Sequence, residues 1–434
     1  MKKKTKASAW MFRVLALVLV LATAAAGWMF WKGGYLGGAQ PDPQIPALQA
    51  TEQTRPATEP QANDPVTTEA PAETPAGTAS EPETEAPETT ETTEAEEPED
   101  RTVTILAVGD NLIHNMVYSS GYSFDPWNYD HLYQYVKDDI QAADIAVIDQ
   151  ETIFVQDHKN VSNYPCFGTP REIGDAVYKA GFDVILHATN HVMDMGIENI
   201  YDAIDFWSDK DVTVLGIHKQ ADEPPVILEK NGIKIGMLNY VYGLNGFVLP
   251  AGNEFAVDLL DYRTKLLNDI AYLEENADIT VGFFHMGQEY ATRPTQDALE
   301  IVELVVSHGV DLLLDCHPHV LQPYEVYTAQ NGNEAVVYHS LGNFISAQTR
   351  LDSLIGGMAQ VTIQKTGRGE DAVTRVVEFG MTPIVTHTAY DASYAVYKLE
   401  DYTDALGARN VLCPMTTAQC WKRYYEIVGK PEEQ

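Results

Sequence analysis

Much of the chain alternates between short apolar runs and amphipathic stretches, and this alternation limits the possible folds most strongly. The apolar runs lie at 102–108, 145–148, 182–186, 212–215, 226–228, 233–238, 279–284, 310–314 and 336–337. They are apolar throughout, as expected of strands in a sheet covered by helices. Helical patterns at 129–141, 171–180, 197–210, 262–275 and 295–308 separate many of them. We therefore predict an α/β domain with much parallel sheet, followed by antiparallel strands at 358–363 and 373–385.

Side chains suited to metal or acid–base chemistry follow several of these runs. The set comprises Asp110, His114, Glu151, Asn190, His191, His285, His317 and His319. Open α/β sheets bind ligands at the carboxyl ends of their strands, so these residues are expected to meet in one pocket. Carboxylate oxygens, an amide oxygen and imidazole nitrogens form a mixed ligand set that suits Mn, Fe or Zn.

Individual residues in this set suggest particular roles. The carboxylate of Glu151 can bridge two cations, and His191 is positioned next to Asn190 to donate a proton. Glu289, Tyr290 and Arg293 follow His285 closely and are candidate substrate contacts at the rim. Ordinary structural roles remain open as well. They are a helix N-cap for Asp110, an N-cap or ion pair for Glu151, and solvated loops for His114 and residues 289–293.

The N-terminus has the pattern of a membrane signal. Basic residues precede an uncharged stretch at 14–31, which Lys32 closes. This predicts a single-pass anchor within residues 1–37, with a cytoplasmic N-terminus and an extracytoplasmic domain. Small residues at 22–26 leave open a secreted form that is released by signal cleavage.

Residues 38–101 are rich in Thr, Glu and Pro and predict a disordered linker. Residues 1–50 carry a net charge of +5 and residues 51–100 carry −14, which leaves −26 of the total −35 for residues 101–434. So acidic a domain is not expected to bind nucleic acid, and cations at its site would have to attract any anionic substrate. Four cysteines are too few for a disulfide framework, although Cys413 and Cys420 could pair outside the cell.

The order of these motifs resembles the CapA family, the capsule-synthesis branch of the calcineurin-like metallophosphatases. The matching motifs are Gly109-Asp110, Glu151, Thr189-Asn190-His191, Asp194-Met195-Gly196, His285-Met286-Gly287, Glu289-Tyr290, His317-Pro318-His319 and Ser340-Leu341-Gly342-Asn343-Phe344. The resemblance covers roughly residues 102–365 and implies a four-layer α/β/β/α sandwich. We expect this domain to occupy residues 102–390 and a helical extension to occupy residues 391–434.

The resemblance also implies a two-metal site. One ion would bind Asp110, His114 and His319, and the other Asn190, His285 and His317. Glu151 would bridge the ions, His191 would be catalytic, and Asn343 would join the substrate contacts. The implied function is hydrolysis or transfer on an anionic cell-surface polymer, the family link suggesting poly-γ-glutamate capsule. The rival hypothesis is a non-catalytic accessory subunit of a capsule synthase or export complex at the membrane.

Overall fold

The structure is a computed structural model that describes residues 100–122, 126–390 and 393–430. The expected membrane anchor lies outside the described residues, as does the expected linker apart from its last two residues. Within the described part of the chain, no helix is both apolar enough and long enough to cross a membrane.

The first of two large sheets contains eight strands. Its order is β16 (Tyr394–Lys398), β15 (Val373–Thr388), β14 (Ile355–Thr366), β1 (Asp100–Asn111), β2 (Ile145–Asp149), β5 (Val184–Leu186) and β6 (Thr213–Leu215), and β13 (Asn343–Ile345) pairs with the end of β1. β1, β2, β5 and β6 run parallel, whereas β14, β15 and β16 continue the sheet in antiparallel fashion. The predicted antiparallel strands after residue 356 are therefore confirmed.

The second sheet contains six strands. Its order is β11 (Tyr324–Thr328), β12 (Glu334–Tyr338), β10 (Leu312–Cys316), β9 (Ile279–His285), β8 (Ile233–Val241) and β7 (Val226–Lys230). The four central strands are parallel, and β7 and β11 are antiparallel edges. A further small pair joins β3 (Phe154–Val155) to β4 (Thr169–Pro170).

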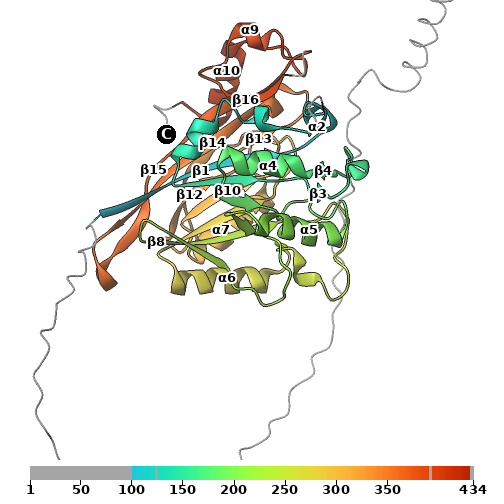
Figure 1. Ribbon diagram of the computed structural model, residues 1–434. Coiled ribbons are helices and arrows are strands. Elements are labelled where there is room, and N and C mark those ends of the chain that lie inside the picture. The colour runs from blue at the N-terminus through green and yellow to red at the C-terminus, as the bar shows by residue number, and fades with distance from the viewer. Residues whose placement is uncertain (1–99, 123–125, 391–392, 431–434) are drawn as a thin grey trace, which may run out of the picture. The chain divides into compact units, whose positions relative to one another are not determined.

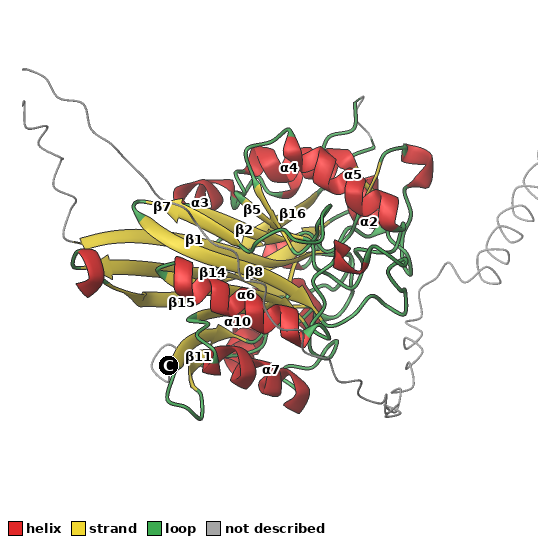
Figure 2. Cartoon of the chain, turned by 90° about the horizontal axis from the view of Figure 1, so that it is seen from below, coloured by secondary structure: helices red, strands yellow, loops and turns green. Residues whose placement is uncertain are grey.

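Helices lie on the two outer sides of the paired sheets. α3 (Lys137–Ala142), α4 (Arg171–Ala180) and α5 (Ile197–Ser208) lie on one side, and α6 (Arg263–Asn276) and α7 (Gln296–Ser307) lie on the other (Figure 2). The helical stretch predicted at 129–141 is wrong in part, because the chain forms a 3-10 turn at Asp130–Leu132 and resumes as a helix only at Lys137.

The residues of the second sheet divide between two cores. Phe283 of β9 and Leu312 of β10 pack into the core that contains the first sheet, whereas the adjacent Phe284 and Leu313 pack against α6 and α7. Each strand is thus covered on both faces, which explains why its sequence is apolar throughout. The α/β class and the stacking of two sheets between helices are confirmed.

The C-terminal segment adds β16, α9 (Asp404–Gly407) and α10 (Thr417–Val428), which lie together at one end of the molecule in Figure 1. The Tyr424 hydroxyl of α10 donates a hydrogen bond to the Met381 carbonyl of β15. Cys413 and Cys420 are free thiols in the structure, and Cys420 is buried next to Met415.

Candidate metal centre

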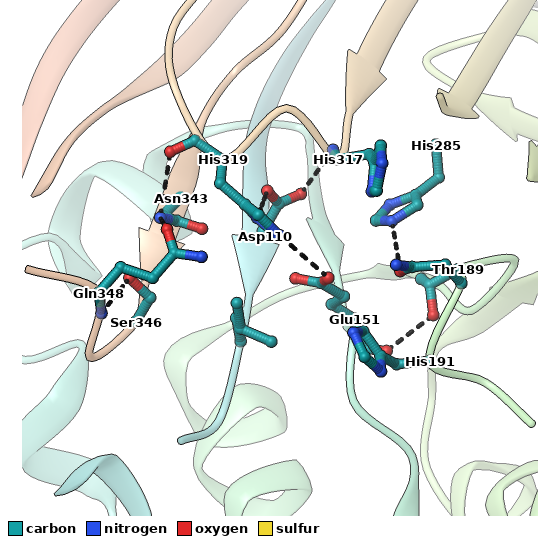
Figure 3. Close-up of polar contacts among 12 residues, drawn as sticks. Asp110, Glu151, Thr189, His191, His285, His317, His319, Asn343, Ser346 and Gln348 are labelled. Atoms are coloured by element: carbon teal, nitrogen blue, oxygen red, sulfur yellow. Dashed lines mark hydrogen bonds and ion pairs between the residues drawn. The ribbon is translucent and has the colours of Figure 1, made fainter. Parts of the chain in front are cut away.

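The polar residues that follow the parallel strands of both sheets converge in one place. Asp110 lies at the end of β1 and Glu151 just after β2, both in the first sheet. His285 ends β9 and His317 follows β10, both in the second sheet. Figure 3 shows these side chains pointing toward one another. The site therefore lies where the carboxyl ends of the two sheets meet, as the sequence predicts.

Gly109 permits the close backbone contact that positions Asp110. A Cβ atom at residue 109 would lie 1.9 Å from the carbonyl oxygen of Gly342, where β13 pairs with β1. The Asp110 amide donates to that same oxygen at 3.1 Å. Residue 109 must therefore be glycine, because any side chain would force the two strands apart.

The first group of candidate ligands consists of Asp110, Glu151 and His319. Their ligand atoms all lie within 4.8 Å of one another, and all three residues are buried. Asp110 Oδ2 lies 2.8 Å from His319 Nδ1, and His319 Nε2 lies 3.8 Å from Glu151 Oε1 (Figure 3). Burial alone would raise the pKa of the Asp110 carboxyl, but the hydrogen bond and positive charge of His319 lower it below its ordinary value.

Glu151 is the clearest sign that a cation belongs here. The residue is fully buried, and within the described chain neither carboxylate oxygen has a hydrogen-bond partner. Burial raises its pKa well above the ordinary value, and the negative charges of Asp110 and Asp149 raise it further. An ionised carboxylate is costly in such a place unless a positive charge compensates it. The residues present therefore fit a divalent cation.

The second group contains Asn190, His285 and His317. His285 Nε2 lies 3.0 Å from Asn190 Oδ1, and the ring centroids of His285 and His317 are 5.0 Å apart. His317 Nδ1 is buried, has no hydrogen-bond partner in the described chain, and belongs to a ring whose pKa burial lowers well below the ordinary value. A neutral imidazole with a bare nitrogen is the form that binds a metal.

Asp149, which the sequence analysis missed, holds His285 in place. Its Oδ2 lies 2.8 Å from His285 Nδ1, and both residues are buried. A carboxylate that binds the second nitrogen of a metal-binding histidine fixes the orientation of the ring. The position of Asp149 at the end of β2 was the available signal.

Cys316 forms an alternative set of ligand atoms with Asp110 and Asp149. Burial raises the pKa of this thiol well above its ordinary value, and the adjacent Asp149 and Asp110 carboxylates raise it further. Without a cation the thiol therefore stays protonated. The set that contains Glu151 supplies two carboxylates and an imidazole, ligands that suit Mn, Fe or Zn, and we regard it as the better cation site.

The histidine segment has an unusual backbone. His317 has φ of 94° and His319 has φ of 58°, in the region that favours glycine. Each such residue costs about 1–3 kcal/mol. The His317 amide donates to Asp110 Oδ1 at 3.0 Å, which helps to hold this conformation. The strain allows two histidines only one residue apart to point into the same buried site.

His191 lies beside the candidate ligands, and its neighbours orient its ring. Its Nδ1 lies 2.7 Å from Asp194 Oδ2, and its ring forms a T-shaped contact with Phe167 at 4.8 Å between centroids. Asn245 Nδ2 lies 3.4 Å from Nδ1 and 3.5 Å from Nε2. A carboxylate can only accept a hydrogen bond, so Nδ1 of His191 carries a proton. Nε2 is then the nitrogen that can give or receive a proton. Asp194 also accepts from the Phe167 amide at 2.7 Å, so it is held in turn. Asp194 is not among the functional residues that the sequence pattern indicated.

His114 belongs to neither group, although the charges of His319 and His191 act on its ring. Its Nδ1 lies 3.2 Å from the Leu112 carbonyl and 3.2 Å from the Ala347 amide. Burial lowers its pKa to about 4, so the ring is neutral. Its nitrogens are in neither set of clustered ligand atoms found in the described chain.

The four expected substrate contacts differ in position. Glu289 is exposed, yet its charge acts on Glu151, so it lies near the site. The ring of Tyr290 lies 6.1 Å from that of His319, at the site itself. Arg293 donates to the Ile427 carbonyl of α10 at 2.7 Å, and Asn343 is buried and donates to the His319 carbonyl.

The chain was also compared with known proteins. The sequence model of the family described as "Bacterial capsule synthesis protein PGA_cap" matches residues 104–348. The PGA biosynthesis protein CapA of Bacillus subtilis is 27% identical over 278 residues, which cover 61% of this chain and 67% of that protein. The capsule biosynthesis protein CapA of Bacillus anthracis is 29% identical over 181 residues, which cover 40% of this chain but only 42% of that protein.

Among solved structures, the NAD nucleotidase of Haemophilus influenzae is similar at a TM-score of 0.41 and 9% identity, covering 76% of this chain and 60% of that one. The matched family model defines the class, because it includes both clusters of candidate ligands and more than half of the chain. The chain belongs to the bacterial capsule synthesis protein family PGA_cap, which confirms the resemblance to CapA.

Proposed function

We propose that this chain is a two-metal hydrolase or transferase that acts on an anionic capsule polymer outside the cell. The buried Glu151 carboxylate carries the proposal, because its unpartnered oxygens face Asp110 and His319. The names of the Bacillus relatives make poly-γ-glutamate the first candidate polymer. The uncharged N-terminal stretch supports anchorage in the membrane, where capsule synthesis or export subunits would be neighbours.

The two groups of ligands would hold one ion each. Asp110 and His319 belong to the first, with His114 as a further candidate, and Glu151 would bridge. The second ion would take Asn190, His285 and His317. Divalent Mn, Fe or Zn in such a site polarises the group to be cleaved and lowers the pKa of bound water.

His191 would act on the leaving group. The Asp194 carboxylate would accept a hydrogen bond from the protonated Nδ1 of His191, so Nε2 would be the atom that gives or receives a proton. Asp194 is then a positioning residue, because it acts through the histidine. Its loss should lower turnover without removing the metal ions.

Metal analysis of the full-length protein tests the proposal. The wild type, purified without chelator, should contain about two equivalents of divalent metal. Glu151→Gln should lose metal, because the carboxylate charge is removed from the centre of the site. Asp311→Asn is the matched control. Asp311 directly precedes β10, at the end of that strand opposite to His317, and its partly buried carboxyl accepts a hydrogen bond from the Thr280 amide. Its substitution should therefore leave the metal content unchanged. Metal-free wild type would refute the proposal.

A second measurement separates catalysis from an accessory role. Poly-γ-glutamate incubated with the metal-loaded wild type should change in chain length, and His191→Gln should abolish the change while retaining the metal. Cells in which His191→Gln still supports polymer export, while His317→Ala merely unfolds the protein, would favour the non-catalytic accessory subunit.

A further inference from the structure

Arg350 lies at the rim of the candidate metal centre. It precedes α8 (Leu351–Leu354) and follows the loop that leaves β13. Its guanidinium carbon lies 4.3 Å from the centroid of the Tyr290 ring, a cation–π contact. The Tyr290 ring in turn lies 6.1 Å from the His319 ring. Arg350, Tyr290 and His319 therefore form a series from the surface to the buried ligands.

Hydrogen bonds hold the backbone segments that carry Tyr290 and Arg350. Tyr290 adopts φ of 64°, and its amide donates to the Pro318 carbonyl between the two histidines at 2.8 Å. Two residues after Arg350, Asp352 accepts two hydrogen bonds from Arg423 of α10, at 2.7 and 2.8 Å. The C-terminal helix thus fixes the segment that carries Arg350.

The charge of Arg350 is available to a ligand. Its side chain is exposed, and within the described chain its guanidinium makes no hydrogen bond or ion pair. Two other arginines nearby are already engaged, Arg293 with the Ile427 carbonyl and Arg423 with Asp352. A guanidinium that stacks on an aromatic ring still presents its N–H groups at the edge, where it can bind a carboxylate or phosphate with two parallel hydrogen bonds.

The surroundings of the site favour such a group for an anionic substrate. The largest effects of neighbouring charges on the Glu151 pKa come from the acidic residues Asp110, Asp149, Glu289 and Asp194, although His319 Nε2 lies 3.8 Å from Glu151 Oε1. The domain as a whole is also strongly acidic, so an anionic chain approaching the site is repelled. Arg350 supplies a local positive charge at the rim of this site.

We propose that Arg350 recognises an oxyanion of the polymer next to the group held at the metal centre. This inference rests on the proposed function and adds to it the residue that binds a carboxylate or phosphate group of the polymer. The stacked guanidinium selects an anionic polymer over a neutral one.

Binding to the full-length protein tests the inference without measuring turnover. The probes are a fluorescent γ-linked glutamate oligomer, a fluorescent glycerol-phosphate oligomer and a neutral fluorescent dextran, followed by anisotropy. Arg350→Gln should weaken binding of one anionic probe about tenfold, equivalent to about 1.4 kcal/mol. The affinity of Arg350→Lys should lie between those of Arg350→Gln and the wild type, because lysine keeps the charge but loses the paired hydrogen bonds. The probe that responds distinguishes carboxylate from phosphate.

Arg375→Gln is the matched control. Arg375 is exposed on β15 and pairs with Gln364, which pairs with Thr102 near the start of β1, at the opposite end of that strand from Asp110. Arg375→Gln changes the net charge by the same amount as Arg350→Gln and should alter the affinity for the anionic probes less than twofold. Equal losses in Arg350→Gln and Arg375→Gln, or no binding of either anionic probe by the wild type, would overturn the inference.

Metal content separates this inference from the proposed function. Arg350→Gln should retain the wild-type metal content, because Arg350 contacts none of the candidate ligands. If the wild type contains no metal but binds an anionic probe through Arg350, the two-metal hydrolase is wrong and the anion site stands. If the metal is present and binding ignores Arg350, the anion site is wrong and the hydrolase stands.

Discussion

The carboxylate of Asp149 lies 2.8 Å from Nδ1 of His285 and joins the two sheets at the candidate metal centre. Asp149 ends β2 of the eight-stranded sheet, and His285 ends β9 of the six-stranded sheet. The contact turns His285 Nε2 toward Asn190 Oδ1, 3.0 Å away. One hydrogen bond therefore connects the two sheets and orients a candidate ligand.

Asp149→Asn should weaken metal binding while leaving the fold intact. The amide is neutral, so it holds the histidine less firmly and makes it a poorer electron donor. Comparable changes behind metal ligands cost about 10–100-fold in affinity. Competition with a fluorescent chelator would measure the loss, and Asp311→Asn should show none. An unchanged affinity would show that Asp149 does not act through a metal-binding histidine.

Glu151→Gln should stabilise the metal-free protein. The carboxylate is buried among like charges without a hydrogen-bond partner, and the neutral amide costs less to bury there. In EDTA the free energy of unfolding should rise by about 1–3 kcal/mol. Added Mn or Zn should then stabilise the wild type and not the variant, because a ligand stabilises only the protein that binds it. Urea denaturation with and without metal would measure both effects, and a variant less stable in EDTA would contradict this explanation.

The sequence indicated the site because apolar strands ending in Asp, Glu, Asn or His are visible in one dimension. Asp110, Glu151, His285 and His319 were found in this way, and the structure brings them together. Within each sheet the central strands run parallel, so the residues that follow them lie at the same edge of the sheet. This placement could be predicted without knowing any distance.

The supporting residues could not be found by the same reasoning. Asp149 matters because β2 and β9 come together from different sheets, and Arg350 because its loop returns to Tyr290. Such contacts join residues far apart in sequence, and neither pattern nor propensity encodes their distance. The helix predicted at 129–141 was wrong in its first half for a related reason. Within that half, the Tyr133 hydroxyl donates a hydrogen bond to Asn111 Oδ1 and its ring packs against Phe344 inside the core, so tertiary contacts set the local structure.

Gly109→Ala should destabilise the protein severely. The new Cβ would meet the Gly342 carbonyl oxygen at 1.9 Å. Gly109 belongs to β1 and Gly342 directly precedes its partner strand β13, so the clash could be relieved only by moving the paired backbones. We expect a loss of about 3 kcal/mol or more in the free energy of unfolding. Gly380→Ala is the matched control, because a Cβ there would meet nothing within 4 Å. Equal urea midpoints for the two variants would show that β1 and β13 can separate freely.

A second charge network, centred on the buried Asp258, lies away from the metal centre. His218 Nε2 lies 2.7 Å from Asp258 Oδ2 and its Nδ1 lies 3.3 Å from Glu223 Oε2. Lys265 binds the other Asp258 oxygen at 2.9 Å and Asp269 at 2.6 Å. These contacts connect the loop after β6 to the start of α6. The Asp258 carbonyl also accepts a hydrogen bond from the Val241 amide at the end of β8, which links the network to the second sheet.

His218 should make the stability of this region depend on pH. Burial alone would lower its pKa, but the hydrogen bond and charge of Asp258 raise the pKa above the ordinary value. The stabilisation is therefore complete below about pH 6.5, the ordinary value for histidine, and is lost as the pH rises through the raised value. His218→Gln should cost about 1–3 kcal/mol at pH 5.5 and much less at pH 9. His308→Gln is the control, because that exposed ring lies 2.7 Å from the Leu304 carbonyl rather than beside a carboxylate. Urea denaturation at both pH values would measure the differences, and a cost for His218→Gln that stays constant between them would show that the histidine is not charged in this network.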